Sequence, residues 1–474
     1  MMNNPLELVA LVERFGHPRI MVIGDLMVDE YIYGNAERLS PEAPVPVVKE
    51  KYREQRAGGA GNVAADLAVL GAQVVCVAIR GNDHQGQLLV SLLQKAGVQT
   101  TGVLGFADRP TTSKTRLVGL AQHRHPQQML RLDQEDTRPI SADEEQQLFN
   151  YIAAELLTCD LVCLEDYNKG LLTAPFCQRI VALARTLKKP VLVDPAAITD
   201  YSKYRGVSTI TPNRTEAEQA SGVVLAEGID TAPQLAKALT KQMELEACVL
   251  TLDRHGVYLL ERHADGTLHG QHHPTRQRNV YDVTGAGDMV LATLAMARAT
   301  GATWSQAVDL ANVAGGLEVE RFGCVPIQKA EILAELLALA GQTHGKLLAL
   351  ADLATELTRR RKLGQKIAFT HGLFDVLTAG DVQHLQLSRQ QGDVLVVGVH
   401  TDESVQNMQG QSQSINTLSE RGEVLAALAA VDFITPYSEE TAAEIIAALV
   451  PDVLVQDAPH MDHPRSSGRK PGAR

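Results

Sequence analysis

Short apolar runs alternate with helix-forming stretches along the N-terminal two-thirds of the chain. The runs have the composition of buried strands and lie at residues 19–25, 74–79, 161–164, 191–194, 209–211 and 248–252. Helical stretches separate most of them, among them residues 60–70, 143–157 and 174–187. This alternation predicts an α/β fold in which helices cover both faces of a parallel sheet. In such sheets ligands bind at the carboxyl ends of the strands.

Two polar stretches, residues 31–53 and 100–133, interrupt the alternation. The second includes the β-rich run T-T-S-K-T-R-L-V. We expect both stretches to form extra strands outside the main sheet, where they would make a lid over a ligand site.

The alternation fades near Pro326 and resumes from Lys366. Between them lies an Ala- and Leu-rich helical stretch, and after Gln456 the chain becomes rich in Pro, Ser, Gly and Arg. Such a tail is typical of disorder. We therefore expect a first domain at 1–330, a helical linker at 331–365, a smaller Rossmann-like α/β domain at 366–456 and a disordered tail at 457–474.

Composition narrows the function classes. The formal net charge of −12 argues against a general nucleic-acid or membrane-surface binder. The basic run at 359–362 is more simply explained as the polar face of a helix end. No apolar run reaches the length that spans a membrane, and the first residues do not resemble a signal peptide.

The six cysteines form no C-x-x-C pair and mostly lie among apolar residues, which predicts reduced core thiols in a cytoplasmic protein. Histidines gather at residues 263–273, with His123 and His125 elsewhere. Their sequence is polar and hairpin-like, so we expect solvated loops rather than a metal site.

The segment D-V-T-G-A-G-D at residues 282–288 is the strongest chemical signal in the chain. A helix-forming run follows its glycines, so several backbone N–H groups would point at one spot and form an anion site. Asp288 could there take a proton from a hydroxyl while the amides stabilise a transferring phosphoryl group. The alternative is a plain tight turn that ends in an aspartate.

Other polar groups follow strands or open helices. Asn62, in G-G-A-G-N, either approaches a ligand or belongs to an ordinary helix entry. Asp25 and Asp29 follow the first strand and could accept hydrogen bonds from sugar hydroxyls. Glu216 lies three residues after Asn213, and it either holds a magnesium-bound water near phosphates or is a capping-box acid.

Together these motifs resemble those of the ribokinase-like carbohydrate kinases. They occur in the order G-G-A-G-N (58–62), D-Y-N-K-G (166–170), T-P-N-R-T-E (211–216) and D-V-T-G-A-G-D (282–288). The run R-L-S-P-E-A-P-V-P-V-V (38–48) resembles the kinase half of the bifunctional heptose 7-phosphate kinases/heptose 1-phosphate adenylyltransferases of lipopolysaccharide-core synthesis. The similarity covers nearly the whole chain and implies an α/β/α sandwich with a β lid.

The resemblance also implies site residues. Asp288 would be the catalytic base, beside an anion hole at Gly285, Ala286 and Gly287. ATP and Mg²⁺ would be bordered by Asn213, Arg214, Thr215, Glu216, Thr251, Gly256 and Asn312, with Glu216 reaching the metal through water. The sugar phosphate would face Asp25, Asp29, Gly58, Gly59, Asn62, Lys114, Arg116 and Lys169. Lys114 and Arg116 are the candidates for its phosphate, a dianion that needs fixed cations.

Two positions depart from the kinases that the chain resembles. Those proteins usually have lysine after Asp-Pro, where this chain has Ala196, and serine before Asp-Tyr, where it has Glu165. Both departures bear on substrate detail more than on the chemistry.

The segment F-T-H-G-L-F-D-V-L-T-A-G-D (369–381) resembles the signature of cytidylyltransferase-like nucleotidyltransferases. In that family an H-x-G-H motif at a helix start binds nucleotide phosphates, but here Thr378 and Asp381 replace the two histidines. A carboxylate repels phosphate oxygens. Glutamines also replace expected cations within 407–413, and the usual segment after Val455 is lost. We therefore expect an inactive second domain.

The sequence thus predicts an ATP- and Mg²⁺-dependent kinase that phosphorylates the anomeric hydroxyl of a heptose 7-phosphate. Two alternatives stay open: a full bifunctional kinase/adenylyltransferase, and a catalytically silent binding or assembly protein. The expected partner is a small sugar phosphate, with no nucleic acid and no membrane. By resemblance alone, the lid implies a homodimer.

Overall fold

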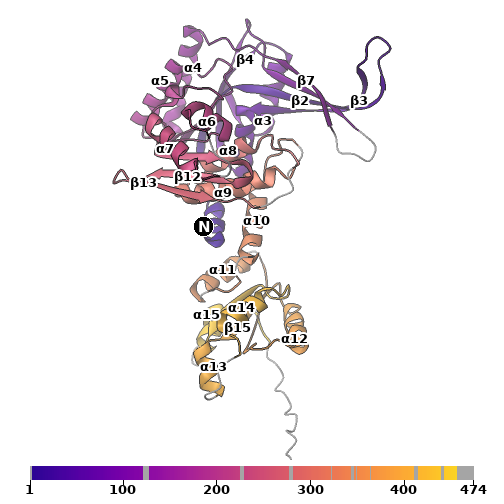
Figure 1. The fold of residues 1–474 in the computed structure, drawn as a ribbon, viewed down its shortest axis with the longest axis vertical. Coiled ribbons are helices and arrows are strands. Elements are labelled where there is room, and N and C mark those ends of the chain that lie inside the picture. Colours follow the sequence, from indigo (N-terminus) through magenta and orange to yellow (C-terminus); the bar gives the residue numbers. More distant parts are fainter. Residues whose placement is uncertain are drawn as a thin grey trace, which may run out of the picture. The chain divides into compact units, whose positions relative to one another are not determined.

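The computed structural model describes residues 3–120, 127–224, 229–276, 281–321, 323–342, 346–348, 350–362, 364–409, 415–438 and 442–455 (Figure 1). His123, His125 and the expected tail at 457–474 lie outside these residues. The chain divides into two compact units, Met1–Leu336 and Leu337–Arg474.

The first unit is built on a nine-stranded sheet with the order β13-β12-β11-β10-β9-β8-β1-β4-β5. Seven neighbouring strands are parallel, and the hairpin β12–β13 adds two antiparallel strands at one edge. The bounds are β1 Arg19–Gly24, β4 Gln73–Gly81, β5 Gln99–Phe106, β8 Leu161–Glu165, β9 Val191–Asp194, β10 Thr209–Ile210, β11 Ala247–Thr251, β12 Val257–Arg262 and β13 Leu268–His273.

Helices follow most of these strands, and the predicted α/β fold is confirmed. They are α1 Pro5–Glu13, α2 Ala60–Leu70, α3 His84–Lys95, α4 Ala142–Glu155, α5 Ala174–Thr186, α6 Arg214–Ser221, α7 Ala232–Met243, α8 Ala286–Ala299, α9 Trp304–Glu318 and α10 Lys329–Gln342. Helix α8 packs against α2 and α9. Helix α2 also contacts β1 and β8, and α8 contacts β8 and β9. This packing brings the starts of α2 and α8 to the carboxyl ends of central strands.

The lid is a separate four-stranded sheet of order β3-β2-β6-β7 (Figure 1). Its strands are β2 Leu26–Leu39, β3 Pro46–Gly59, β6 Ser113–Gly119 and β7 Gln127–Gln134. The expectation that all of 100–133 lies outside the main sheet is wrong for β5, which pairs in parallel with β4. Because β5 follows α3 and buries Val103, it continues the strand–helix alternation.

One histidine also departs from expectation. His263 and His269 are exposed, whereas His273 is only 1% exposed, and its Nδ1 lies 2.6 Å from Asp309 Oδ1. The prediction of solvated loops is therefore wrong for His273. Its ring turns inward from the edge strand and hydrogen-bonds α9, as a buried polar group requires.

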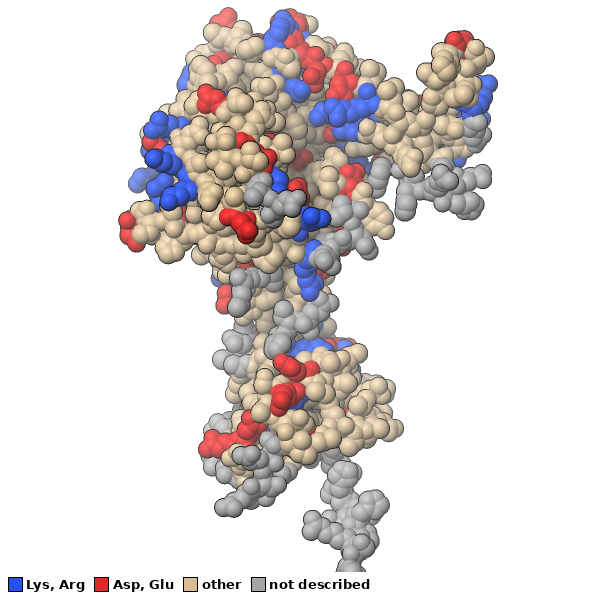
Figure 2. All heavy atoms as spheres, viewed as in Figure 1, with Lys and Arg blue, Asp and Glu red and all other residues tan. Residues whose placement is uncertain are grey.

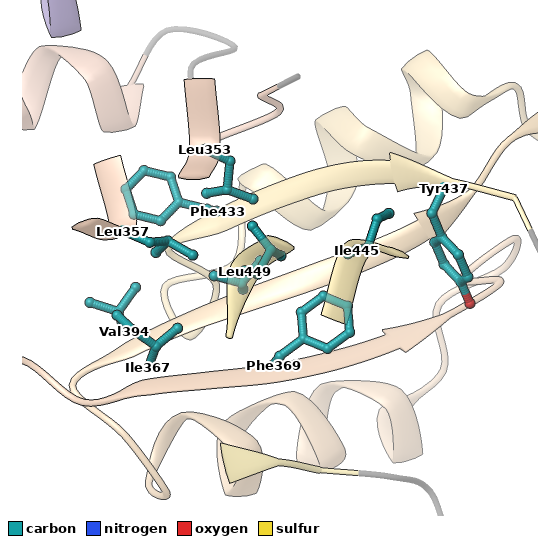
Figure 3. Packing of buried hydrophobic residues seen from close by; sticks show 10 residues of the cluster. Leu353, Leu357, Ile367, Phe369, Val394, Phe433, Tyr437, Ile445 and Leu449 are labelled. Carbon is teal, nitrogen blue, oxygen red and sulfur yellow. The ribbon is translucent and has the colours of Figure 1, made fainter. Parts of the chain in front are cut away.

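The second unit has a four-stranded parallel sheet of order β16-β15-β14-β17. Alternate side chains point to opposite faces, so Ile367 and Phe369 pack with α11 and α15, while Ala368 packs with α12 and α14 (Figure 3). The bounds are α11 Leu350–Lys362, β14 Ile367–Gly372, α12 Ala379–Arg389, β15 Val394–His400, α13 Asp402–Gln409, α14 Leu418–Ala426, β16 Phe433–Tyr437, α15 Ala442–Leu449 and β17 Val453–Leu454.

On the face shown in Figure 2, Lys and Arg side chains lie among Asp and Glu side chains over the first unit. Within the described residues, every helix is too short or too polar to cross a membrane.

Candidate active site

Three segments that are far apart in the sequence meet at Asp288. Gly285 adopts a left-handed conformation (φ 94°) and α8 begins directly after it, which places Asp288 in the first helical turn. The Asn62 side-chain amide donates to Asp288 Oδ2 over 2.8 Å, and the Tyr167 hydroxyl donates to Oδ1 over 3.3 Å. The carboxylate is 6% exposed, so these bonds fix its orientation in a nearly dry site.

Burial raises the pKa of Asp288 to about 6. The hydrogen bonds from Asn62 and Tyr167 oppose this rise, as does the positive charge of Lys114. A carboxyl group of this pKa is ionised at neutral pH and is a stronger base than an exposed aspartate, which suits a group that takes a proton from a hydroxyl.

The glycine turn leaves room that a side chain would fill. A Cβ atom at Gly285 would lie 2.6 Å from a Glu318 carboxylate oxygen, and one at Gly287 would reach Asp194 at 3.5 Å. The Ala286 amide donates to the Val283 carbonyl over 3.3 Å. The expected anion hole therefore borders two further acids, Glu318 and Asp194.

The residues expected to face the sugar gather where the lid meets the main sheet. A Cβ atom at Gly58 would lie 1.9 Å from Asp29 Oδ2, so a larger residue there would displace the Asp29 carboxylate. Gly59 is left-handed (φ 57°) and caps α2. Asp25 accepts the backbone N–H groups of Tyr167 and Lys169 at 3.0 Å each, and burial raises its pKa to about 6.

The three cations expected to face the sugar phosphate differ in their partners. Arg116 forms an ion pair with Asp29 over 2.5 Å, and the Lys169 ammonium forms one with Glu135 over 2.6 Å. The Lys114 ammonium lies 5.1 Å from the centre of the Tyr167 ring, and no hydrogen bond or ion pair to it is present in the described residues. Burial lowers its pKa.

Most of the expected nucleotide-binding residues are linked to one another, or to shared neighbours, by backbone and side-chain contacts; together we call them the wall. Asn213 and Glu216 make a capping box at the start of α6, in which each side chain accepts a hydrogen bond from the other's backbone N–H. The backbone of Asn213 also forms an isolated parallel β-bridge with Thr251. Gly256 and the Asn312 side chain both adjoin the backbone of His273 and Pro274. Arg214 Nε lies 3.9 Å from Asp253, and Thr215 is exposed.

Several site residues were missed from the sequence. Tyr167 stands inside the D-Y-N-K-G motif, whose family pattern does not indicate the hydrogen bond that its hydroxyl donates to Asp288. Glu165 and Asp194 end β8 and β9, and one carboxylate oxygen of each lies within 4.8 Å of the other and of one from Asp288. Their positions at strand ends were the available signal.

Two buried carboxyl groups lie near the turn. Asp66 on α2 and Glu318 on α9 have no hydrogen-bond partner within the described part of the chain for any of their four oxygens. Burial, and to a smaller extent the charge of Asp288, raises the pKa of Glu318 to about 8. Burial also raises the pKa of Asp66, in the field of Glu318.

The Glu318→Gln variant should therefore unfold less readily than the wild type at pH 8. The pKa of Glu318 is raised from about 4.5 to about 8 by folding. The stability that protonated Glu318 contributes is therefore complete below pH 4.5 and is lost as the pH rises from 4.5 through 8. We expect a gain on the order of 1–3 kcal/mol at pH 8 and almost none at pH 4.5.

Denaturant unfolding of the first unit across this pH range measures the effect. Glu7→Gln, at an exposed position on α1, is the matched control and should leave the pH slope unchanged. Equal pH slopes for wild type and Glu318→Gln would show that Glu318 does not titrate in this way.

In the second unit, Thr378 and Asp381 bind each other at the start of α12. Asp381 Oδ2 accepts from the Thr378 backbone N–H over 2.7 Å and from its hydroxyl over 2.6 Å. The Asp381 N–H donates back to the Thr378 hydroxyl over 3.3 Å. This capping box puts a carboxylate at the helix N-terminus, where the resembled enzymes bind phosphate.

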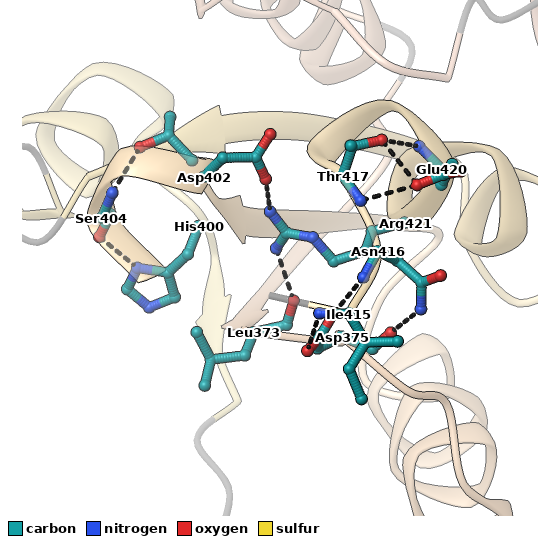
Figure 4. Close-up of polar contacts among 11 residues, drawn as sticks. Leu373, Asp375, His400, Asp402, Ser404, Ile415, Asn416, Thr417, Glu420 and Arg421 are labelled. Atoms are coloured by element: carbon teal, nitrogen blue, oxygen red, sulfur yellow. Dashed lines mark hydrogen bonds and ion pairs between the residues drawn. The ribbon is translucent and has the colours of Figure 1, made fainter. Parts of the chain in front are cut away.

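The loops around that helix are firmly held (Figure 4). The buried Arg421 donates to the Leu373 carbonyl and pairs with Asp402 over 2.7 Å. Asp375 accepts the backbone N–H groups of Ile415 and Asn416 over 2.9 Å. The loop that precedes α12 therefore keeps an ordered shape.

Comparisons with known proteins agree with this architecture. The pfkB family carbohydrate kinase model matches residues 17–330, and the cytidylyltransferase-like model matches 369–465. Bifunctional protein HldE of Wolinella succinogenes is 40% identical over 441 residues, which is 93% of this chain and 90% of that protein. The HldE of Citrifermentans bemidjiense is 39% identical over 450 residues, with 95% and 90% covered.

Solved structures resemble the first unit in fold. Arabidopsis thaliana ribokinase complexed with ribose and ATP has a TM-score of 0.51 at 20% identity, covering 68% of this chain and 99% of that one. Escherichia coli phosphofructokinase-2 in complex with potassium has a TM-score of 0.54 at 16% identity, with 68% and 99% covered. The chain therefore belongs to the bifunctional HldE family, in which a pfkB family carbohydrate kinase is joined to a cytidylyltransferase-like domain.

Proposed function

We propose that the first unit transfers a phosphoryl group from ATP to the anomeric hydroxyl of D-glycero-D-manno-heptose 7-phosphate. The product would be heptose 1,7-bisphosphate, on the route to ADP-heptose and the lipopolysaccharide core. The observation that carries the proposal is the buried Asp288 carboxylate, oriented by Asn62 and Tyr167 beside the glycine turn of α8. The same geometry argues against a catalytically silent protein.

Each group has a chemical task in this scheme. Asp288 takes the proton of the attacking hydroxyl, and the N-terminal amides of α8 stabilise charge on the transferring group. ATP lies along the wall that Asn213, Thr251 and Asn312 border. The carboxylates near these residues are hard oxygen donors that suit Mg²⁺, and Glu216 would hold the ion through water. The ion would supply positive charge to the phosphates.

An ADP-release assay over a panel of sugars and sugar phosphates tests this function. We expect the highest kcat/KM for the heptose 7-phosphate and little activity with the unphosphorylated heptose. ADP release that no sugar stimulates would contradict kinase activity, and preference for another sugar phosphate would contradict the substrate assignment alone.

The Lys114→Ala variant should raise the KM for the sugar phosphate and leave the KM for ATP almost unchanged. The Lys114 ammonium is available for a substrate phosphate, whereas Arg116 and Lys169 are held by acids. Losing one charge-assisted contact should cost roughly 1.5–3 kcal/mol, or about 10- to 150-fold in KM.

Steady-state kinetics with each substrate varied in turn measure this change. Lys51→Ala, at an exposed position on lid strand β3, removes the same charge away from the site and is the matched control. An unchanged KM for the sugar phosphate in Lys114→Ala would exclude Lys114 as its phosphate ligand.

The second unit is open to two interpretations. Its match to the cytidylyltransferase-like model and the name bifunctional of its relatives favour the alternative in which both domains are active. The Thr378–Asp381 capping box supports the opposite interpretation, because it places a negative charge where an anion would bind. We propose on this local ground that the unit does not transfer AMP.

We also propose a cytoplasmic homodimer that forms through the lid. Leu130 and Leu132 lie on one face of the edge strand β7 and are 60% and 65% exposed. An apolar face on an edge strand is a favourable surface for a second copy.

The proposed cytoplasmic location is supported by the cysteines. All six are buried thiols, which fits a reducing compartment.

A further inference from the structure

Glu165 and Asp194 stand side by side at the ends of two neighbouring parallel strands. They are register partners in the β8–β9 ladder, and α8, which carries Asp288, packs against both strands. One carboxylate oxygen of each residue lies within 4.8 Å of the others. Three acids from three elements therefore converge on one small volume.

Glu165 contributes an oxygen that the protein leaves unused. Its side chain is 2% exposed, and no described group forms a hydrogen bond with its buried Oε2. By contrast, Asp194 accepts from the Thr211 hydroxyl over 3.1 Å, and Asp288 is held by Asn62 and Tyr167. A buried carboxylate oxygen without a hydrogen-bond partner, on a side chain that lies beside two other carboxylates, is an arrangement that a cation completes.

Further charge around the cluster is mainly negative. Asp25 and Asp166 add to the field at Glu165, and Glu216 adds to the field at Asp194. The positive charge of Lys114 acts on Asp288. Burial and this mutual repulsion raise the pKa of both Glu165 and Asp194. A cation bound among these carboxylates would relieve their mutual repulsion.

The spacing suits a divalent ion. Ligand oxygens on opposite sides of an ion are about 4 Å apart for Mg²⁺ and about 5 Å apart for Ca²⁺, given their usual bond lengths. The separations of up to 4.8 Å fall in this range or need only a small closure. Carboxylate oxygens are also the ligands that such hard cations prefer.

We propose that Glu165, Asp194 and Asp288 hold a divalent cation directly, through their carboxylate oxygens, before nucleotide binds. This site is distinct from the water-mediated contact proposed for Glu216, since Glu165 and not Glu216 is its defining ligand. The inference rests on the proposed kinase function in that the site lies within the proposed active site. Ion binding without nucleotide is nevertheless measured independently of phosphoryl transfer.

The test is titration of the full-length chain with Mn²⁺ alone, followed by the electron paramagnetic resonance signal of free Mn²⁺. We expect the wild type to bind Mn²⁺ without nucleotide and Glu165→Gln to bind it at least about tenfold more weakly. Glu261→Gln, a β12 glutamate in the same sheet, is the matched control and should bind like the wild type. Mn²⁺ should also raise the melting temperature of the first unit in the wild type but not in Glu165→Gln.

If Glu165→Gln does not fold, Glu165→Ser is used as the test variant, because it also removes the Glu165 carboxylate. Mn²⁺ binding of wild-type strength in a folded Glu165 variant would overturn the proposal. So would the lack of nucleotide-free binding in the wild type at millimolar Mn²⁺. Neither result would bear on the ADP-release assay, so a failed metal site and a failed kinase assignment are distinguishable.

Discussion

Replacing Asp288 with asparagine should lower kcat by at least ~10²-fold, the low end for a positioned general base. The side chain keeps its size, and its amide oxygen can still accept the hydrogen bond from Asn62. It cannot take a proton from the sugar hydroxyl. The fold and the affinity for ATP should therefore survive while the chemical step fails.

Single-turnover measurement of ADP formation, combined with equilibrium binding of ATP, separates these effects. Asp143→Asn is the matched control because Asp143 also stands in the first turn of a helix, α4, away from the site. Phosphorylation of the sugar phosphate by Asp288→Asn at close to the wild-type rate would show that another group is the base.

The whole chain should form no pyrophosphate or nucleotide-sugar from ATP and heptose 1-phosphate. Adenylyl transfer adds negative charge at the α-phosphate, and removing one preorganised donor typically costs ~10²–10³ in rate. Here Thr378 and Asp381 stand where the resembled enzymes have two histidines, and the Asp381 carboxylate occupies the helix start. The kinase product should accumulate.

Coupled pyrophosphate detection measures this, with added pyrophosphate as a recovery control. The assay is repeated with Asp288→Asn to remove any contribution from the first unit. Pyrophosphate release that requires the sugar 1-phosphate and persists in that variant would establish an active second unit, as the bifunctional relatives favour.

The sequence predicts the layered fold well because each buried strand and covering helix has its own local period. It does not predict which sheet a strand joins. Strand β5 pairs with β4 because α3, which connects them, packs against both strands, and this is a tertiary contact. Motif residues around Asp288 do meet, because glycine turns and strand ends set their positions locally.

The sequence does not indicate which charged side chains will pair with each other. In the lid, Lys114 is the register partner of Asp29, yet the ion pair of Asp29 is with Arg116, which stands opposite Tyr31. Lys169 pairs instead with Glu135. Likewise, the Glu165–Asp194 contact follows from the β8–β9 register, which no local motif reports. Such choices depend on contacts between distant segments.

The central position of β1 fixes an order of assembly during synthesis. Its Ile20 pairs with Leu161 of β8, so one edge of the first strand made stays open until more than a hundred further residues have emerged. Closing a loop of that length slows folding and leaves an apolar edge exposed to association. Asp25 can accept its two backbone hydrogen bonds only after Tyr167 and Lys169 have been synthesised. Asn62 can donate to Asp288 only later still. The active site is therefore among the last features of this unit to form on the ribosome.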